Sequence, residues 1–269
     1  MITWNVKDEQ CKSDLTQLLG LETTGANGHQ LADIYAIGLQ EVPFETDITE
    51  SPTQHTWANG FAKVLGQLEY VLLKRIGVTN VGRQEGSKGA LTVRFIVNGV
   101  SVCIVNTHLT PHDQHLDQRI DNYNDIIGKQ NILSDDYVLW MGDLNFRIDD
   151  LTADEIHDTI ISTGSFAQLL AKDQLNRVKR EGRAFSEFSE TVPSFAPTYK
   201  FLANTNNYDF RGQERSRKPA YTDRILYRVN PDMSATKHVD LKQMSYKSYP
   251  QYVQSDHKPV SALFLIKFQ

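Results

Sequence analysis

Residues 138–149 read VLWMGDLNFRID, and this stretch decides how the rest of the chain is interpreted. Its first four residues are apolar without alternation, as in a strand that is covered on both faces. Gly142 follows, and then Asp143 and Asn145 stand two residues apart. Asp and Asn often form the turns that end strands, so a turn is one interpretation. The alternative is that both side chains lack protein partners because a ligand supplies them.

The chain has the size and composition of an ordinary globular protein. Its 269 residues can bury a large core, and they contain no Pro/Gly/Ser-rich linker, repeat or block of like charge. We therefore predict that residues 1–269 form a single domain, and that this domain is monomeric. The two cysteines, Cys11 and Cys103, are too few for a disulfide framework and favour a reducing, cytoplasmic location.

Membrane-spanning and export signals are not evident in the sequence. No apolar run approaches the ~18 residues that a membrane span requires. The first ten residues, MITWNVKDEQ, lack the charged and apolar regions of a signal peptide and lead directly into a predicted strand. We expect the chain to be one domain of a longer protein.

The formal net charge of −5 argues against general attraction to nucleic acid or to anionic membranes. The charge is unevenly distributed, because residues 199–228, here called the basic segment, contain seven basic and three acidic residues. A local excess of positive charge on an acidic protein suits a compact polyanionic ligand better than a long one. The alternative is a solvated surface loop.

Eight segments have the composition of β-strands. They are residues 2–6, 34–40, 69–76, 90–97, 100–108, 137–143, 222–229 and 259–268. Four segments have helical spacing or capping signals, namely residues 13–20, 114–133, 151–164 and 166–182. Asn98 and Gly99 form a strong hairpin signal between two of the strands. Hairpins mixed with helical connections predict an α/β fold, a four-layer sandwich of two packed mixed β-sheets flanked by helices. No Gly-x-Gly-x-x-Gly motif supports a doubly wound sheet.

Several predicted strands carry polar side chains at one end. These side chains are Asn5, Glu41, Asn106, His108, Asp143, Asn145, Asp223, Asp256 and His257. One polar strand end is uninformative, but six in one chain predict a site along one rim of the sandwich. Because side chains two residues apart lie on the same side of a strand, Asp143 and Asn145 are expected to face one cleft, as are Asn106 and His108.

Seven short motifs resemble those of one known protein family. They are TWNV (3–6), IGLQEVP (37–43), NTHL (106–109), GDLNFRI (142–148), PTYKF (197–201), KPAYTDRIL (218–226) and SDHKPV (255–260). In this order they resemble the inositol polyphosphate 5-phosphatase family, which belongs to the deoxyribonuclease I-like superfamily of metal-dependent phosphoesterases. The resemblance covers nearly the whole chain and implies the deoxyribonuclease I-like sandwich. The region near the start is most similar to the subgroup of skeletal muscle and kidney enriched inositol phosphatase.

The resemblance implies a Mg²⁺-dependent phosphatase that removes the 5-phosphate of phosphoinositides such as phosphatidylinositol 4,5-bisphosphate. The 3,4,5-trisphosphate and soluble inositol polyphosphates are further candidate substrates. Mg²⁺ prefers oxygen ligands. Glu41 and Asp256 are assigned to it, with Asn5 either as a ligand or as an amide beside the ligands. Zinc is disfavoured because no Cys/His cluster has ligand spacing.

In the implied reaction, Asp143 positions and deprotonates the attacking water, and Asn145 donates to a phosphoryl oxygen. His257 contacts the scissile phosphate, and Asp223 accepts a hydrogen bond from its other ring nitrogen. His108 is a second donor to the phosphate, although a structural histidine is an alternative. Whether Asp143 or His257 takes the proton of the water is left open.

The resemblance also assigns substrate contacts. Lys88 in the sequence GSKGA is one of them. Tyr199, Lys200, Arg215 and Arg217 of the basic segment are assigned to the phosphate next to the one removed. The implied partner is a phosphoinositide lipid, reached by peripheral association with a membrane surface, or a soluble inositol polyphosphate.

The chain departs from the family pattern in three ways. Tyr221 stands where the family usually has Trp, Ser87 stands where it has Asn, and the interval from Glu41 to Lys88 is short. These departures affect the expected contacts to the 1-phosphate and glycerol, and the number of strands.

Two other functions compete with the phosphatase. A nuclease of the same superfamily shares the metal-binding Glu, the Asp-x-Asn pair and the Asp-His pair. The acidic net charge disfavours duplex binding, and PTYKF and KPAYTDRIL favour the phosphatase, so no nucleic-acid partner is predicted. The second competitor is a catalytically inactive phosphoinositide-binding module, against which the intact acid, amide and histidine motifs argue.

Overall fold

The computed structural model describes residues 1–21, 31–43, 56–72, 89–163, 166–209, 218–232 and 240–268. These ranges contain the strands β1 (Ile2–Asn5), β2 (Ile37–Gln40), β3 (Gly89–Val97), β4 (Val100–His108), β5 (Tyr137–Asp143), β6 (Asp223–Val229), β7 (Asp240–Ser248) and β8 (Val260–Lys267). The strands form two four-stranded sheets, ordered β2-β1-β8-β7 and β3-β4-β5-β6. The pairs β1–β2 and β4–β5 are parallel and the others antiparallel, so both sheets are mixed, as predicted.

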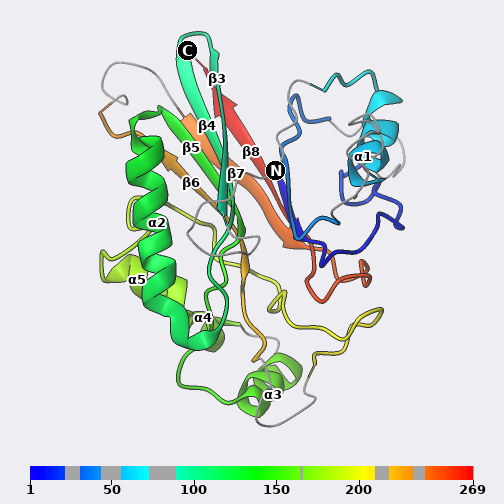
Figure 1. Cartoon of the computed structure of the whole chain (residues 1–269), viewed down its shortest axis with the longest axis vertical. Helices are drawn as coiled ribbons and strands as arrows, with labels where there is room; N and C mark the ends of the chain where they lie inside the picture. Colours follow the sequence, from blue (N-terminus) through cyan, green and yellow to red (C-terminus); the bar gives the residue numbers. More distant parts are fainter. Residues whose placement is uncertain are drawn as a thin grey trace.

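Helices lie outside both sheets (Figure 1). They are α1 (Thr56–Gly66), α2 (Leu116–Gln130), α3 (Ala153–Thr163), α4 (Ala167–Ala171) and α5 (Gln174–Arg180), with 3-10 turns η2 (Asp113–His115) and η3 (Ile132–Ser134). α2 and α5 share one core with the β3–β6 sheet, whereas Trp57 of α1 packs on Trp4 of β1 with ring centroids 5.0 Å apart. The predicted four-layer sandwich is confirmed. Within the described ranges, none of the helices has the length and hydropathy to cross a bilayer.

The space between the two sheets changes from apolar to polar along β4. Val102 and Ile104 belong to the apolar core between the sheets. Asn106 and His108 follow at the same two-residue spacing, and there Gln40 Nε2 donates to Asn106 Oδ1 at 2.6 Å, which joins β2 to β4 across the sheets. The carboxyl ends of β4 and β5 therefore open onto a polar region.

The backbone angles at Asn98-Gly99 and at Gly142 explain why these residues stand there in the sequence. Asn98 and Gly99 have φ angles of 48° and 78°, as expected for the turn that closes the predicted hairpin between β3 and β4. Gly142 has a φ angle of 146°, and a Cβ at this position would lie 2.0 Å from the carbonyl oxygen of Thr107. Only glycine allows β5 to lie this close to β4, which brings Asp143 level with His108.

Two of the predicted helices differ from the structure. The predicted helix over residues 13–20 is wrong, because turns replace it. Asp14 Oδ1 accepts hydrogen bonds from the N–H and hydroxyl of Thr16 at 2.9 and 2.6 Å, and such local bonds compete with a helix. The segment 166–182 is divided into α4 and α5, because the Asp173 side chain accepts from the N–H of Asn176 and begins a new helix.

Strand predictions fail where the hydrophobic pattern misleads. Residues 69–72 form a turn and irregular chain, so the strand predicted over 69–76 is wrong for its described part, and residues 73–76 lie outside the described residues. The pattern does not predict α1 or β7. β7 reads DLKQMSYKS, in which only Tyr246 is buried, so pairing along β8 contributes more to its strand character than its few apolar residues do.

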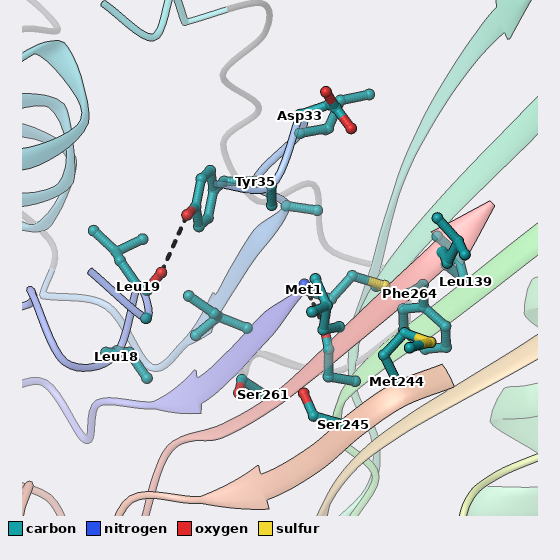
Figure 2. Close-up of a pocket in the computed structure, with 18 of the residues that line it drawn as sticks. Met1, Leu18, Leu19, Asp33, Tyr35, Leu139, Met244, Ser245, Ser261 and Phe264 are labelled. Carbon is teal, nitrogen blue, oxygen red and sulfur yellow. Dashed lines mark hydrogen bonds between the residues drawn. The ribbon is translucent and has the colours of Figure 1, made fainter. Parts of the chain in front are cut away.

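A cavity of about 850 Å³ lies toward the strand ends that are opposite to the polar ones (Figure 2). Met1, Leu139, Met244 and Phe264 are among the residues that line it. None of the residues that the sequence assigns to catalysis, metal or substrate lines this cavity in the described part of the chain. The predicted chemistry therefore belongs to the other end of the sandwich.

Candidate active site

The polar strand ends meet at one rim of the sandwich. His108 at the end of β4 is the register partner of Asp143 at the end of β5, and Asp143 is the partner of Asp223 at the start of β6. Asn5 ends β1, and Glu41 directly follows its parallel neighbour β2. Since parallel strands end at the same edge of a sheet, side chains from distant parts of the sequence come together here. The prediction that these groups share one rim is confirmed.

The segment before β8 is fastened to β1 by two hydrogen bonds, and a third joins Ser255 to His257 within the segment. Ser255 Oγ donates to the Asn5 carbonyl oxygen at 2.6 Å and accepts from the N–H of His257 at 3.1 Å. Trp4 Nε1 donates to the His257 carbonyl oxygen at 3.1 Å. These bonds hold Asp256 and His257 at the rim, where their side chains contact different partners.

Asp143 is a buried carboxylate surrounded by donors. Asn5 Nδ2 donates to its Oδ2 and the Asn145 N–H donates to its Oδ1, both at 3.0 Å. The Nε2 atoms of His108 and His257 lie 3.3 and 3.8 Å from Oδ2. Burial raises the pKa of Asp143, but the charges of His257 and His108 and the hydrogen bonds from His108 and Asn5 outweigh burial and hold this pKa below its usual range. Asp143 is therefore ionised at neutral pH.

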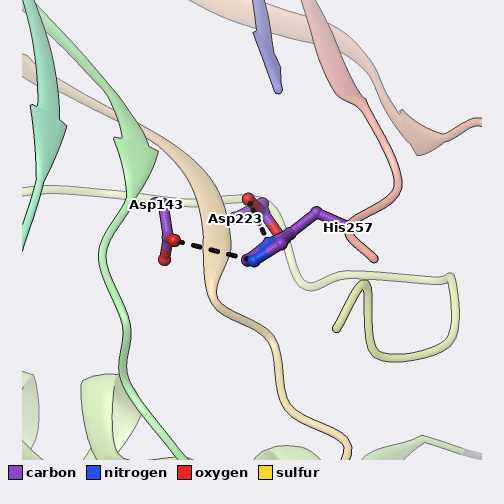
Figure 3. Close-up of side chains that lie close together, drawn as sticks. All are labelled: Asp143, Asp223 and His257. Carbon is purple, nitrogen blue, oxygen red and sulfur yellow. Dashed lines mark hydrogen bonds and ion pairs between the residues drawn. The ribbon is translucent and has the colours of Figure 1, made fainter. Parts of the chain in front are cut away.

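His257 lies between two carboxylates (Figure 3). Its Nδ1 donates to Asp223 Oδ2 at 2.9 Å, and its Nε2 faces Asp143. Burial lowers the pKa of His257, but the charges of Asp223 and Asp143 and the hydrogen bond to Asp223 raise it to about 9. The hydroxyls of Thr198 and Thr222 donate to Asp223 at 2.6 and 2.9 Å and orient it. His257 is thus an imidazolium at neutral pH, with both ring nitrogens as donors.

Glu41 is the most exposed of the four predicted acids, with 36% of its side chain accessible. Asn5 Nδ2 donates to Glu41 Oε1 at 3.2 Å, and His108 Nε2 lies 3.7 Å from the same oxygen. Because the same Asn5 nitrogen bonds Asp143, one amide ties the two carboxylates together. This contact supports Asn5 as an amide that positions the acids.

Asp256 is buried and pairs with Lys7, whose Nζ lies 2.6 Å from Asp256 Oδ2. The backbone N–H of Lys7 donates to Asn5 Oδ1 at 3.0 Å. Asp256 therefore joins the same network of contacts as Asn5 and Glu41.

Two groups of side chains are candidates for holding a divalent cation. Asp143, Asp223 and His257 each offer a ligand atom, and these atoms lie within 4.8 Å of one another. The Nδ1 of His257 is already hydrogen-bonded to Asp223, however. Glu41 and Asp256 offer oxygen atoms only, and the exposure of Glu41 leaves room for water ligands. This donor chemistry fits a hard cation such as Mg²⁺ better.

Asp143 and Asn145 are not unpaired, which corrects the expectation from the sequence. Asn145 Nδ2 donates to the Leu109 carbonyl oxygen at 3.0 Å, and Asn145 Oδ1 accepts from Arg147 Nη2. Arg147 also donates through Nε to the Asn145 carbonyl oxygen at 3.0 Å, and its guanidinium lies 4.9 Å above the ring of Tyr199. Since Arg147 occupies the amide oxygen, the group that Asn145 can offer a ligand is its NH₂.

Sequence reasoning missed three residues that shape the site, namely Lys7, Arg147 and Thr198. Arg147 and Thr198 lie within the motifs GDLNFRI and PTYKF, so the motifs themselves contain the signal. Lys7 follows TWNV and lies in none of the seven motifs.

The predicted substrate-binding residues divide into two groups. The Tyr199 ring packs on His257 with ring centroids 4.4 Å apart, and Lys200 Nζ lies 3.6 Å from Asp209 Oδ2 with its side chain 23% exposed. Tyr199 therefore lies at the rim, and Lys200 lies beside it in the neighbouring loop. Lys88, Arg215 and Arg217 lie outside the described residues, as does Ser87.

The basic segment is not a uniform cationic surface. Arg224 is fully buried and pairs with Asp173 at 2.9 Å and with Glu190 at 2.6 Å. It joins β6 to the start of α5, so at least one of the seven basic residues of this segment is not available to a ligand. Tyr221, at the position where the family usually has Trp, is also fully buried.

Comparison with known proteins defines the family. Residues 74–263 match the family described as Endonuclease/Exonuclease/phosphatase family 2. The chain is 34% identical to phosphatidylinositol 4,5-bisphosphate 5-phosphatase A of Homo sapiens, over 100% of this chain and 30% of that protein. It is 32% identical to inositol polyphosphate 5-phosphatase K of Mus musculus, over 98% of this chain and 64% of that protein.

A solved structure agrees with these relatives. The inositol polyphosphate 5-phosphatase domain of a synaptojanin, in complex with inositol (1,4)-bisphosphate and calcium ion, matches with a TM-score of 0.80 and 29% identity, covering 99% of this chain and 84% of that one. The chain therefore belongs to the endonuclease/exonuclease/phosphatase family, and within it to the inositol polyphosphate 5-phosphatases. Its membership of the skeletal muscle and kidney enriched subgroup stays a prediction.

The chain is shorter than its relatives. It spans less than a third of the Homo sapiens protein and just under two thirds of the Mus musculus protein. The alignment with the former runs over 313 positions whereas the chain has 269 residues, so that relative has insertions that this chain lacks.

Proposed function

We propose that this chain is a Mg²⁺-dependent phosphatase that hydrolyses the 5-phosphate of phosphoinositides such as phosphatidylinositol 4,5-bisphosphate. The observation that carries the proposal is one network that contains an ionised Asp143, an imidazolium at His257 and a half-buried carboxylate at Glu41. Phosphate hydrolysis requires an oriented water and positive charge or donors around the phosphoryl oxygens. Relatives that are named for 5-phosphatase activity support the choice of substrate.

We assign the cation to Glu41 and Asp256, with Asn5 holding Glu41 in place. When bound there, Mg²⁺ supplies positive charge that stabilises the phosphoryl oxygens. The calcium named in the synaptojanin complex supports a divalent cation in this family but does not select magnesium.

The residues around the phosphate have separate roles in the proposed reaction. Asp143 orients the water and accepts its proton, and its ionised state supports this role. His257 donates from Nε2 to the scissile phosphate, and Asp223 keeps it charged and oriented. The NH₂ of Asn145 and the ring of His108 are further donors. Because His257 is protonated at neutral pH, Asp143 is the better candidate for the proton acceptor.

Recognition of the phosphate next to the one removed is assigned to Tyr199 and Lys200, and on sequence alone to Lys88, Arg215 and Arg217. Their ammonium and guanidinium groups suit a phosphate that does not react. The 3,4,5-trisphosphate and soluble inositol polyphosphates are further candidate substrates.

We further propose that residues 1–269 form one monomeric catalytic domain. It would work in the cytoplasm and reach lipid headgroups by peripheral association with phosphoinositide-containing membranes, because its predicted substrate carries its phosphates at the membrane surface.

Phosphate release from a short-chain phosphatidylinositol 4,5-bisphosphate tests the proposed function. We expect release that requires Mg²⁺ and stops with EDTA, and a product that retains the 4-phosphate. Phosphatidylinositol 4-phosphate with the same chains is the matched control and should release nothing. Soluble inositol 1,4,5-trisphosphate in parallel shows whether the lipid part matters.

The same panel separates the competing functions. Duplex DNA with one abasic site should stay intact, and nicking at a rate similar to phosphate release would indicate a nuclease. Lipid binding without any Mg²⁺-dependent release would indicate an inactive binding module.

A further inference from the structure

Lys7 makes an ion pair with one of the acids assigned to the cation. Its Nζ lies 2.6 Å from Asp256 Oδ2, and 49% of the Lys7 side chain is exposed whereas only 8% of the Asp256 side chain is. A buried carboxylate therefore has its positive partner on the solvent side of the rim. Neither the motifs nor the proposed reaction uses this lysine.

The backbone around Lys7 forms a tight turn at the rim. Lys7 and Asp8 have φ angles of 49° and 58°, so two successive non-glycine residues adopt the left-handed conformation. The turn is held from both sides, because the Lys7 N–H donates to Asn5 Oδ1 at 3.0 Å and the Asp8 N–H donates to the Glu41 carbonyl oxygen at 2.6 Å. The backbone from which the Lys7 side chain reaches Asp256 is thus tied to Asn5 and to Glu41.

We propose that Lys7 is a tethered counter-ion of Asp256 that competes with the divalent cation and weakens its binding. This inference rests on the proposed function, because it takes Asp256 as a ligand of that cation. A cation that uses Asp256 must either displace the ammonium from Oδ2 or bind the other oxygen with a positive charge close by. Both arrangements oppose cation binding. The site then needs a higher cation concentration to fill, since Asp256 already has a positive partner in the empty form.

Removal of the Lys7 charge is expected to tighten cation binding about 5- to 20-fold, the scale of a partly exposed charge a few ångströms from a divalent ion. The probe is Mn²⁺ alone, titrated into the full chain without substrate at low ionic strength. Free Mn²⁺ is followed by electron paramagnetic resonance, and Mg²⁺ is then added as a competitor. Lys7→Met is the test variant, and Lys7→Gln is the second variant should the first fold poorly.

Two controls separate this effect from a general change of charge. Lys7→Arg keeps the charge and should bind Mn²⁺ as the wild type does. Lys12→Met removes a nearby lysine that is somewhat more exposed than Lys7 and that pairs with Glu9 at 2.9 Å instead of Asp256. This variant should also match the wild type.

The outcomes distinguish this inference from the proposed function. Mn²⁺ binding that is at least 5-fold tighter in Lys7→Met than in the wild type supports the role of Lys7. Equal or weaker binding in Lys7→Met, with saturable Mn²⁺ binding in the wild type, overturns the role of Lys7 and leaves the phosphatase proposal standing. No saturable binding in any variant contradicts the cation site itself, and the role of Lys7 with it.

Discussion

Asp143→Asn is expected to lower turnover at least ~10²-fold and to leave the fold intact, because a positioned acid–base group contributes on this scale. The substitution keeps the shape of the side chain and the acceptor for Asn5 or Asn145, but it removes the charge that faces His108 and His257. An uncharged amide can neither accept the proton of the water nor keep the imidazolium in place. Phosphate release from short-chain phosphatidylinositol 4,5-bisphosphate measures the loss, and circular dichroism checks the fold.

Asp135→Asn is the matched control for this experiment. Asp135 is also buried and also paired, with Arg94 Nε at 2.8 Å, but it lies just before β5, at the end of that strand remote from Asp143. A folded Asp135→Asn should keep its turnover. Near-normal turnover in Asp143→Asn, or equal losses in both variants, would remove Asp143 from the reaction.

Asp223→Asn is expected to be the second large loss, about 10²-fold at neutral pH, since it removes the main charge that keeps His257 protonated. The pKa of His257 is raised from its ordinary 6.5 to about 9 in the folded protein, so the imidazolium contributes stability below pH 6.5 that is lost as the pH rises through about 9. Without Asp223, burial and the charge of Asp143 remain, and the pKa of His257 should fall. The alkaline limb of the pH–rate profile should then move to lower pH.

The imidazole signals of His257, followed by NMR against pH, measure this shift directly. Asp240→Asn is the control, because Asp240 also begins a strand and faces a cation, Lys267 at 3.6 Å, but on an exposed surface. It should move neither the His257 titration nor the rate profile. An unchanged pKa of His257 in Asp223→Asn would show that the proposed pairing does not control the charge of this ring.

The parts of the fold that could be predicted are those whose residues carry their own signal. The apolar runs in β4 and β5 and the Asn98-Gly99 turn between β3 and β4 need no knowledge of neighbours. β7 could not be predicted in this way, because its strand forms by pairing with β8. Residues 13–20 gave a wrong helix prediction, because the local hydrogen bonds of Asp14 override their helical spacing.

The candidate site could likewise be predicted only in part from the sequence. The polar strand ends predicted which residues meet, because strand direction alone brings His108, Asp143 and Asp223 to one edge. The contacts among them could not be predicted. Lys7 and Asp256 are 249 positions apart, and they come together because β1 pairs with β8 and because Ser255 and Trp4 fasten the segment before β8 to β1. The partners of Asn145 likewise depend on how Arg147 packs against the ring of Tyr199.

The proposed reaction requires a cation held by Glu41 and Asp256, apart from the charged pair of His257 and Asp223. Crystals grown with Mn²⁺ test this directly, because an anomalous difference map locates the ion independently of the protein phases. We predict one peak within coordination distance of the Glu41 carboxylate, with His257 still bonded to Asp223. A peak enclosed by Asp143, Asp223 and His257, or none near Glu41 at saturating Mn²⁺, would contradict the account.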